Sequence, residues 1–199
     1  MFLQSPINNC LVKIERRYQD QQGCVKIDPT WRPEEFATLE GIVVSAPIKI
    51  ENDRNRTVLG TVEKGDKIIF SYAVIYAYAS QPENDTPIYK NLIIHNGEEF
   101  WKVDLGEVFC KVGNTVEMIT DNVLIEPLEV RGTYDSNGLL RLAEKCEDMG
   151  IVKALPPNIN LSVRVGDTVC FEPRFVQKYN ILGQEHYIIP TRRMLAKAN

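Results

Sequence analysis

The chain has 199 residues, of which 23 are basic and 27 acidic, giving a net charge of −4 without any long basic run. This balance argues against a nucleic-acid-binding surface, and we expect no nucleic-acid partner. Residues 1–6 lack the features of a secretory signal, and no apolar run approaches the roughly 18 residues of a membrane span, so we expect a cytoplasmic protein with no membrane partner.

The first half of the chain reads as short strands and loops. A strand is predicted at residues 9–15, and a long irregular segment at 19–39 is interrupted by prolines. Another strand is predicted at 41–46, followed by a hairpin with a charged tip at 48–59. Residues 70–78 alternate large and small side chains, which predicts a strand with one aromatic-rich face. The large side chains are Phe70, Tyr72, Val74, Tyr76 and Tyr78.

Asn96-Gly97 stands between two apolar runs and is the dipeptide that best predicts a two-residue type I′ hairpin turn. No stretch of the chain has a convincing amphipathic helical pattern. The pattern and the elimination of helices together predict an all-β fold.

One turn-and-strand device occurs twice in the chain. Gly65-Asp66 and Gly166-Asp167 each precede a short run of β-branched and aromatic residues. In each copy the glycine can adopt a positive φ, and the aspartate can hydrogen-bond nearby backbone before the strand begins. We therefore predict two equivalent turns, each leading into a strand.

Four further sequence blocks repeat in the same order around these turns. They are residues 9–15 with 122–126, 41–47 with 150–156, 97–103 with 183–189, and 108–111 with 194–197. The spacers are longer in the first copy, as expected when two copies differ in loop length. The repeat predicts two domains, 1–119 and 120–199. Domains this small bury a limited share of their surface, so we expect a homo-oligomer.

The cysteines, histidines and serines of the chain form no recognisable catalytic or metal-binding pattern. The five cysteines are far apart and odd in number, and we interpret them as free, mostly buried thiols. His95 and His186 do not align between the copies and have no ligands at metal-binding spacing, so they are interpreted as surface or hairpin residues, and no metal or cofactor is expected. No serine or cysteine lies in a recognisable nucleophile turn, so we predict that the protein is not an enzyme.

Both copies place an apolar cluster directly after a glycine in a polar loop. Apolar side chains contribute binding or folding free energy only when a contact removes them from water, so these residues are candidates for partner binding. The alternative interpretation is a strand that packs on its own sheet. The candidate residues are Gly23, Cys24, Val25 and Ile27 in the first copy, and Gly138, Leu139, Leu140 and Leu142 in the second.

This succession of strands, loops and turns resembles the GroES-like co-chaperonins, present twice. The closest matches are residues 163–171, residues 97–103 and the terminal Met194-Leu195-Ala196. The resemblance implies two tandem GroES-like irregular β-barrels. It also places the mobile loop of that family at residues 19–39 and 131–148.

In that family an apolar triplet of the mobile loop docks on the apical domain of an ATP-driven chaperonin ring. The resemblance therefore implies a lid or assembly protein that binds a chaperonin ring to assist protein folding. The third triplet position is basic here, Lys26 and Arg141. Either Ile27 and Leu142 supply the contact one residue later, or docking has been lost because burying a charge is costly. The alternative function is a GroES-fold binding or scaffold module that no longer binds a chaperonin, for example through the tyrosines of residues 70–78.

Overall fold

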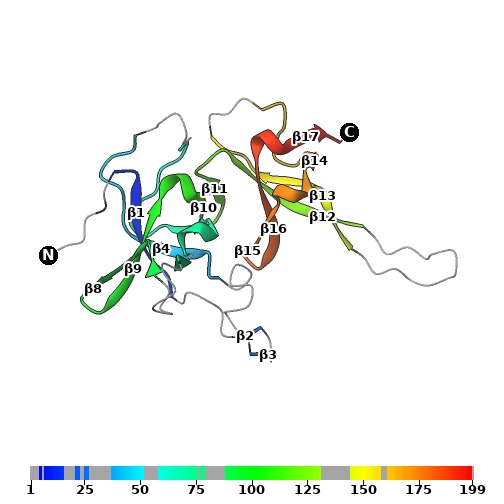
Figure 1. Cartoon of the computed structure of the whole chain (residues 1–199). Helices are drawn as coiled ribbons and strands as arrows, with labels where there is room; N and C mark the ends of the chain where they lie inside the picture. The colour runs from blue at the N-terminus through cyan, green and yellow to red at the C-terminus, as the bar shows by residue number, and fades with distance from the viewer. Residues whose placement is uncertain are drawn as a thin grey trace. The chain divides into compact units, whose positions relative to one another are not determined.

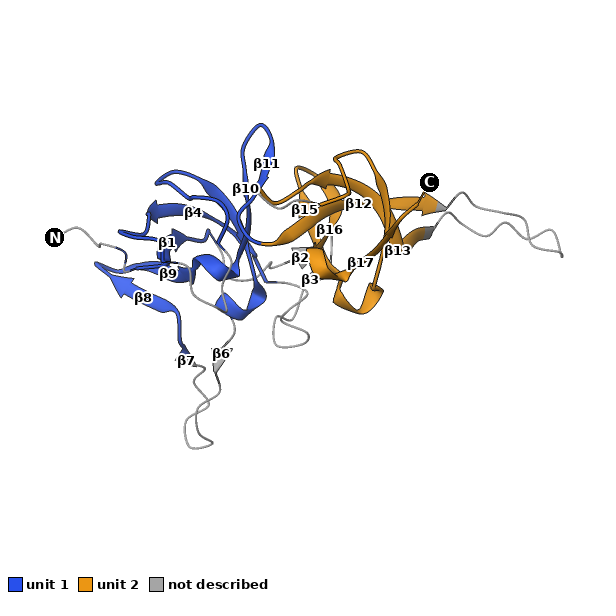
Figure 2. Ribbon diagram, turned by 90° about the horizontal axis from the view of Figure 1, so that it is seen from above, with its two compact units in different colours: residues 1–120 blue, residues 121–199 orange. Residues whose placement is uncertain are grey.

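The computed structural model describes residues 5, 7–15, 21–22, 25–26, 37–51, 58–75, 77–78, 88–130, 144–157 and 161–198. In these residues every regular element of more than three residues is a β-strand, and the strands form two large antiparallel sheets (Figure 1). The predicted all-β class is confirmed. The chain divides into two compact units, Met1–Thr120 and Asp121–Asn199 (Figure 2).

Unit 1 is built on a seven-stranded sheet in the order β11-β10-β5-β4-β1-β9-β8. Its strands are β1 (Asn9–Lys13), β4 (Glu40–Ser45), β5 (Lys67–Phe70), β8 (Leu92–His95), β9 (Glu98–Asp104), β10 (Val108–Val112) and β11 (Val116–Met118). Two minimal ladders accompany it, β2 (Gln21–Gln22) with β3 (Val25–Lys26), and β6 (Ala77–Tyr78) with β7 (Ile88–Tyr89). Short 3-10 turns lie at η1 (Tyr72–Val74) and η2 (Leu105–Glu107).

Unit 2 is built on a six-stranded sheet in the order β15-β16-β12-β13-β14-β17. Its elements are β12 (Asn122–Val130), β13 (Glu144–Ala154), β14 (Thr168–Phe171), η3 (Pro173–Phe175), β15 (Gln177–Ile181), β16 (Gln184–Pro190), η4 (Thr191–Arg193) and β17 (Met194–Lys197). Read from β8, the order of the unit 1 sheet is β8-β9-β1-β4-β5-β10, and these six strands correspond one by one to β15-β16-β12-β13-β14-β17. The additional strand of unit 1 is β11, next to β10. The two units therefore share a strand order that follows the repeated sequence blocks. Their identity as GroES-like barrels stays a prediction.

The Gly-Asp turns have the predicted conformation in both units. Gly65 has φ of 99° and Gly166 has φ of 94°, in the region that side-chain-bearing residues rarely adopt. The carboxylates of Asp66 and Asp167 each accept a hydrogen bond, at 2.8 Å, from the backbone N–H three residues earlier. The prediction for these turns is confirmed, down to the same hydrogen bond in each copy.

A second pair of glycines lies where two strands approach too closely for a side chain. A Cβ on Gly41 of β4 would lie 2.4 Å from Cγ1 of Val12, and a Cβ on Gly150 of β13 would lie 2.3 Å from Cγ2 of Ile125. Val12 and Ile125 occupy equivalent places in β1 and β12. Each sheet therefore needs a glycine at this one place.

Each unit also has a hairpin closed by a two-residue turn. Asn96 and Gly97 have φ of 53° and 78° and connect β8 to β9, which confirms the predicted type I′ turn. Leu182 and Gly183 have φ of 54° and 81° and connect β15 to β16 in the same way. No turn dipeptide marks the second hairpin in the sequence, because leucine is not a turn residue.

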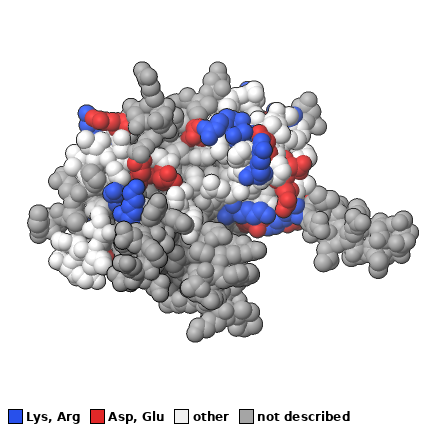
Figure 3. All heavy atoms as spheres, viewed as in Figure 1, with Lys and Arg blue, Asp and Glu red and all other residues white. Residues whose placement is uncertain are grey.

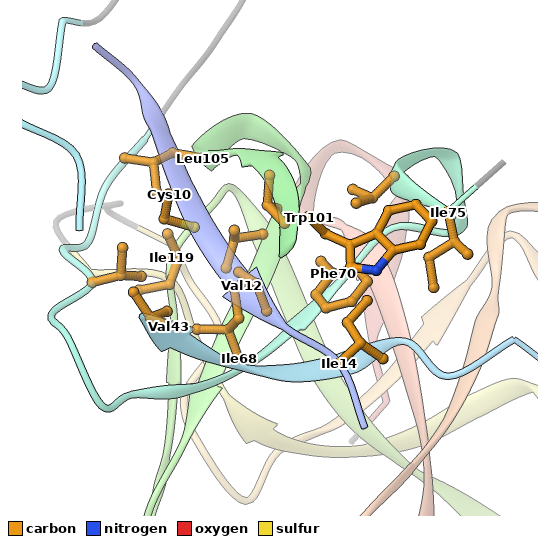
Figure 4. Close-up of a cluster of buried hydrophobic side chains, with 14 of the residues drawn as sticks. Cys10, Val12, Ile14, Val43, Ile68, Phe70, Ile75, Trp101, Leu105 and Ile119 are labelled. Atoms are coloured by element: carbon orange, nitrogen blue, oxygen red, sulfur yellow. The ribbon is translucent and has the colours of Figure 1, made fainter. Parts of the chain in front are cut away.

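The cores of the two units use equivalent positions. Figure 4 shows side chains from β1, β4, β5 and β9 of unit 1 converging on one cluster. Trp101 in this cluster and Tyr187 in unit 2 occupy equivalent positions, and each makes an edge-on contact with another ring. The ring centroids of Trp101 and Tyr89 are 5.8 Å apart, and those of Tyr187 and Phe171 are 6.1 Å apart. The buried cluster of unit 2 consists of Val123, Ile125, Val152, Val169, Phe171, Tyr187 and Ile189.

The predicted strand at residues 70–78 is wrong. β5 ends at Phe70, and the Ser71 hydroxyl accepts a hydrogen bond from the Ala73 N–H (3.2 Å), which caps the 3-10 turn η1. Alternation of residue size indicated a strand, but a local serine cap bends the backbone out of it. The tyrosines of this segment therefore do not line one face of a single strand.

The two predicted loops are also shorter or more ordered than expected. Residues 144–148, assigned to the second loop, belong to β13, and Glu144 and Lys145 pair with Val130 and Glu129 of β12. Within 19–39, the expected irregular segment contains the β2–β3 ladder. Both differences arise because the backbone pairs with a neighbouring strand, and the sequence of a polar segment does not predict such pairing.

Candidate functional site

The predicted partner-binding residues fall in the same connection of each unit. The first group lies between β1 and β4, and the second lies between β12 and β13. Val25 is in β3, where its backbone faces Gln22, and nothing is described of its side chain. The other predicted residues lie outside the described part of the chain: Gly23, Cys24, Ile27, Gly138, Leu139, Leu140 and Leu142. The structure therefore places the connections but not the apolar side chains.

The connection in unit 2 starts from a long antiparallel ribbon. β12 and β13 remain paired as far as Val130 and Glu144, beyond the neighbouring strands of the sheet (Figure 1). The register shifts between Pro127 and Glu129, where proline offers no N–H to the ladder. In unit 1, β1 ends at Lys13. Lys13 pairs with Ile42 of β4, and this is the last pair between those two strands. Among the described residues, the paired support is therefore longer at the second loop than at the first.

Two ion pairs connect this ribbon to the β15–β16 hairpin. The Lys145 ammonium lies 3.1 Å from a Glu185 carboxylate oxygen, and that of Lys178 lies 3.8 Å from Glu147. These side chains are largely exposed, so each pair contributes little to stability. Figure 3 shows acidic and basic side chains next to one another on the face in view. The charged side chains beside this ribbon therefore form local ion pairs and do not make a patch of one charge sign.

A charged and aromatic cluster in unit 2 was missed by the sequence reasoning. The Glu172 carboxylate accepts hydrogen bonds from Arg174 (2.9 and 3.0 Å) and Arg193 (3.3 Å), and both guanidinium groups lie over the Phe175 ring, at 4.9 and 3.8 Å from its centroid. The bond from Arg174, followed by that from Arg193, lowers the pKa of Glu172. The cluster holds two guanidinium groups and one carboxylate, and the contacts of Arg193 with Glu172 and Phe175 fasten η4 to η3.

The equivalent place in unit 1 lacks this cluster. Ser71, Ala73 and Val74 stand where Glu172, Arg174 and Phe175 stand in unit 2. The adjacent Arg192-Arg193 pair was the sole sequence signal, and it does not reveal the partners on η3.

Cys10 and Cys110 are buried thiols of low reactivity, and His186 is buried in its hairpin. Cys10 and Cys110 are buried, and burial raises the pKa of each thiol to about 12, which leaves almost no thiolate at neutral pH. The Nδ1 atom of His186 lies 3.0 Å from the Gln184 carbonyl oxygen. His186 belongs to the β15–β16 hairpin, as expected for a hairpin residue, but its exposed fraction is 6%, so the surface alternative is wrong.

Within the described residues there is no group of three or more histidine, cysteine, aspartate or glutamate side chains placed to hold a metal ion. In the same part of the chain, no helix has the length and apolar character required to cross a bilayer.

No protein-family model matches the chain, and no curated protein matches it at a significant level.

Proposed function

We propose that this protein is a co-chaperonin-like lid or assembly protein, which binds an ATP-driven chaperonin ring through apolar loops and acts without chemistry of its own. One observation carries the proposal: two units with the same strand order place the predicted apolar clusters in the same connection, between their first and second shared strands. A duplicated β scaffold that displays the same element twice suits a protein that binds a multivalent partner.

The proposed mechanism couples ordering of each loop to its docking. Ordering costs conformational entropy, so one loop binds weakly, and several loops on one assembly bind tightly yet reversibly. The β12–β13 ribbon fixes both ends of the second loop, at Val130 and Glu144, and reduces the entropy that remains to be lost. The second loop is therefore the stronger of the two contacts in this proposal.

The test measures binding of the full chain to a chaperonin ring purified from the same cell, with and without ATP. We expect ATP-dependent binding, and we expect Leu139→Ala with Leu140→Ala to weaken it at least about tenfold, because two buried apolar side chains are lost at each site. Leu182→Ala is the matched control, since Leu182 is a leucine of the same unit, 67% exposed and outside the loop.

Two results contradict the proposal. Failure of the unaltered chain to bind the ring with ATP leaves the binding or scaffold module as the better function. Equal weakening by Leu182→Ala and by the double substitution shows that the loop is not the contact.

A further inference from the structure

The two hairpins give the two sheets edge strands of different character. β8 pairs with β9 in unit 1 and β15 pairs with β16 in unit 2, and no strand among the described residues pairs with the other side of either. In the equivalent registers, Leu92 and Ile94 of β8 stand where β15 has Lys178 and Asn180. The open edge of unit 1 is therefore apolar at two places where that of unit 2 is polar.

An edge strand pairs with other chains unless charged or polar side chains oppose it. β15 has such protection, since the Lys178 ammonium lies 3.8 Å from Glu147 of the β12–β13 ribbon. β8 contains no lysine, acidic residue or proline, and Ile94 on it is 68% exposed. The edge of β8 therefore has the character of a strand that accepts a partner.

The hydrogen bonds of the hairpin determine which backbone groups of β8 face this edge. A two-residue turn makes the strand residues on either side of it a hydrogen-bonded pair, and such pairs recur at every second residue. The Lys102 N–H donates to the Asn91 carbonyl oxygen (2.8 Å), in agreement with this alternation. Leu92 and Ile94 therefore direct their N–H and C=O groups away from β9, to the open edge.

We propose that the β8 edge pairs antiparallel with the β8 edge of a second copy of this chain, across a two-fold axis at Ile93. In this register Leu92 of each chain forms a hydrogen-bonded pair with Ile94 of the other, so the backbone groups that face the edge are all satisfied. A shift of one residue opposes groups that face the edge with groups that face away from it. The backbone pattern therefore selects the register.

The side chains support a second copy of the chain as the occupant. Ile93 and Phe100 face each other on one side of the hairpin and are half-buried, and the axis places them beside the same pair of the other chain. On the opposite side, Ile94 meets Leu92 of the other chain, which packs on the unit 1 core. Because β8 has no charged residue, its own copy opposes no like charges.

The contact is small, because each chain contributes one short strand. Stable interfaces bury about 1,600 Å² in total, so two edge strands of this length give a weak and reversible dimer. The same surface is used by both chains, so the contact closes at two and does not propagate. The inference uses strand pairing alone and does not rest on the proposed function.

The first experiment tests the register with a cysteine on the axis. Cα atoms of a non-hydrogen-bonded antiparallel pair are about 4.5 Å apart, within reach of a disulfide. We expect Ile93→Cys to form a disulfide-linked pair of chains with oxidised glutathione, above the background of the unaltered chain. Ile42→Cys is the control, because Ile42 is 44% exposed and lies on β4, inside the same sheet. No linked pair, or equal linkage of the control, overturns the proposal.

The second experiment measures mass by sedimentation over a range of concentrations. We expect the mass of the unaltered chain to double with concentration, from 22.7 kDa for a single chain. Ile94→Lys should raise the dissociation constant at least about tenfold, because an ammonium group loses hydration beside Leu92 of the other chain. Leu182→Lys is the control, since Leu182 is 67% exposed on the unit 2 hairpin. A constant mass, or equal weakening by both variants, contradicts the β8 contact.

Discussion

Unit 1 and unit 2 are alike inside their sheets, and they differ most at one sheet edge and in the residue type at one hairpin turn. Inside, Val12 and Ile125 pack against the glycines of the neighbouring strand in the same way. At the edges, β11 covers β10, whereas no described strand covers the equivalent side of β17. At the turns between the edge strands, asparagine in unit 1 is replaced by leucine in unit 2.

The difference shows which positions specify the shared topology. Core positions tolerate a change of residue type, since Cys10 is replaced by Val123 and Trp101 by Tyr187 without a change of strand order. Volume and apolar character are sufficient there. Glycine is kept in both units at three equivalent pairs of positions. Gly65 and Gly166, and Gly97 and Gly183, have positive φ, and Gly41 and Gly150 lie where strands touch.

The largest expected effect comes from filling the close strand contact. In Gly150→Ala the new methyl group would lie 2.3 Å from Cγ2 of Ile125 and 2.5 Å from the Glu126 carbonyl oxygen, so backbone must move. We expect unit 2 to lose about 3 kcal/mol or more of its free energy of unfolding. Hydrogen exchange of the full chain, followed separately for peptides of each unit, measures this loss.

Gly41→Ala tests whether the same contact is as tight in unit 1. Its methyl group would meet Val12 at 2.4 Å, but the nearest backbone atom, the Lys13 carbonyl oxygen, is at 2.9 Å. We expect a loss of about 1–3 kcal/mol, smaller than for Gly150→Ala. Gly113→Ala is the control, because its nearest atom is 3.9 Å away. A larger effect at Gly41 than at Gly150 would contradict the ranking of the two contacts.

Much of the fold could be predicted because local signals agreed with long-range pattern. The Gly-Asp turns and Asn96-Gly97 were predictable from backbone chemistry, and the all-β class followed from the absence of helical patterns. The region after Phe70 was not, because a capped 3-10 turn and a strand can share an alternating pattern. Leu182 gave no signal, since its positive φ is imposed by the hairpin around it.

The candidate site could be predicted only as a position in the chain. Repeated apolar clusters identify a connection, and the structure shows that connection to be equivalent in both units. The Glu172 cluster was beyond sequence reasoning, because η3 and η4 are brought together by the pairing of β14 with β17. Long-range pairing of this kind leaves no local signature.

A smaller, pH-dependent effect distinguishes the Gly-Asp turn of unit 2. The Lys197 ammonium, followed by the Arg164 N–H, lowers the pKa of Asp167 from its ordinary value of 3.8. Because the folded-state pKa lies below the unfolded one, the ionised carboxylate stabilises unit 2 above the unfolded pKa, and this stabilisation is lost as the pH falls through the folded value. Asp167→Asn keeps an oxygen for the Arg164 N–H but removes the titration.

We therefore expect Asp167→Asn to lower the stability of unit 2 near neutral pH, and its difference from the unaltered chain to disappear in acid. Urea unfolding at a series of pH values measures this difference, with hydrogen exchange of the unit 2 peptides as the readout. Lys197→Met is the matched variant that removes the partner instead of the acid. A difference that grows as the pH falls would show that the sign of the linkage is wrong.

The smallest expected effect is an exchange of the two hairpin turns. Leu182→Asn places in unit 2 the residue that unit 1 uses at φ of 53°, and it removes an exposed leucine from a conformation that β-carbon sterics disfavour. We expect a gain of about 0.5–1 kcal/mol in unit 2, and a loss of similar size in unit 1 for Asn96→Leu. Exchange of the amides in β15 and β16 measures the first change, and that of β8 and β9 the second. If Leu182→Asn instead destabilises unit 2, the turn conformation alone does not decide the stability of this hairpin, and the two hairpins are held by different interactions.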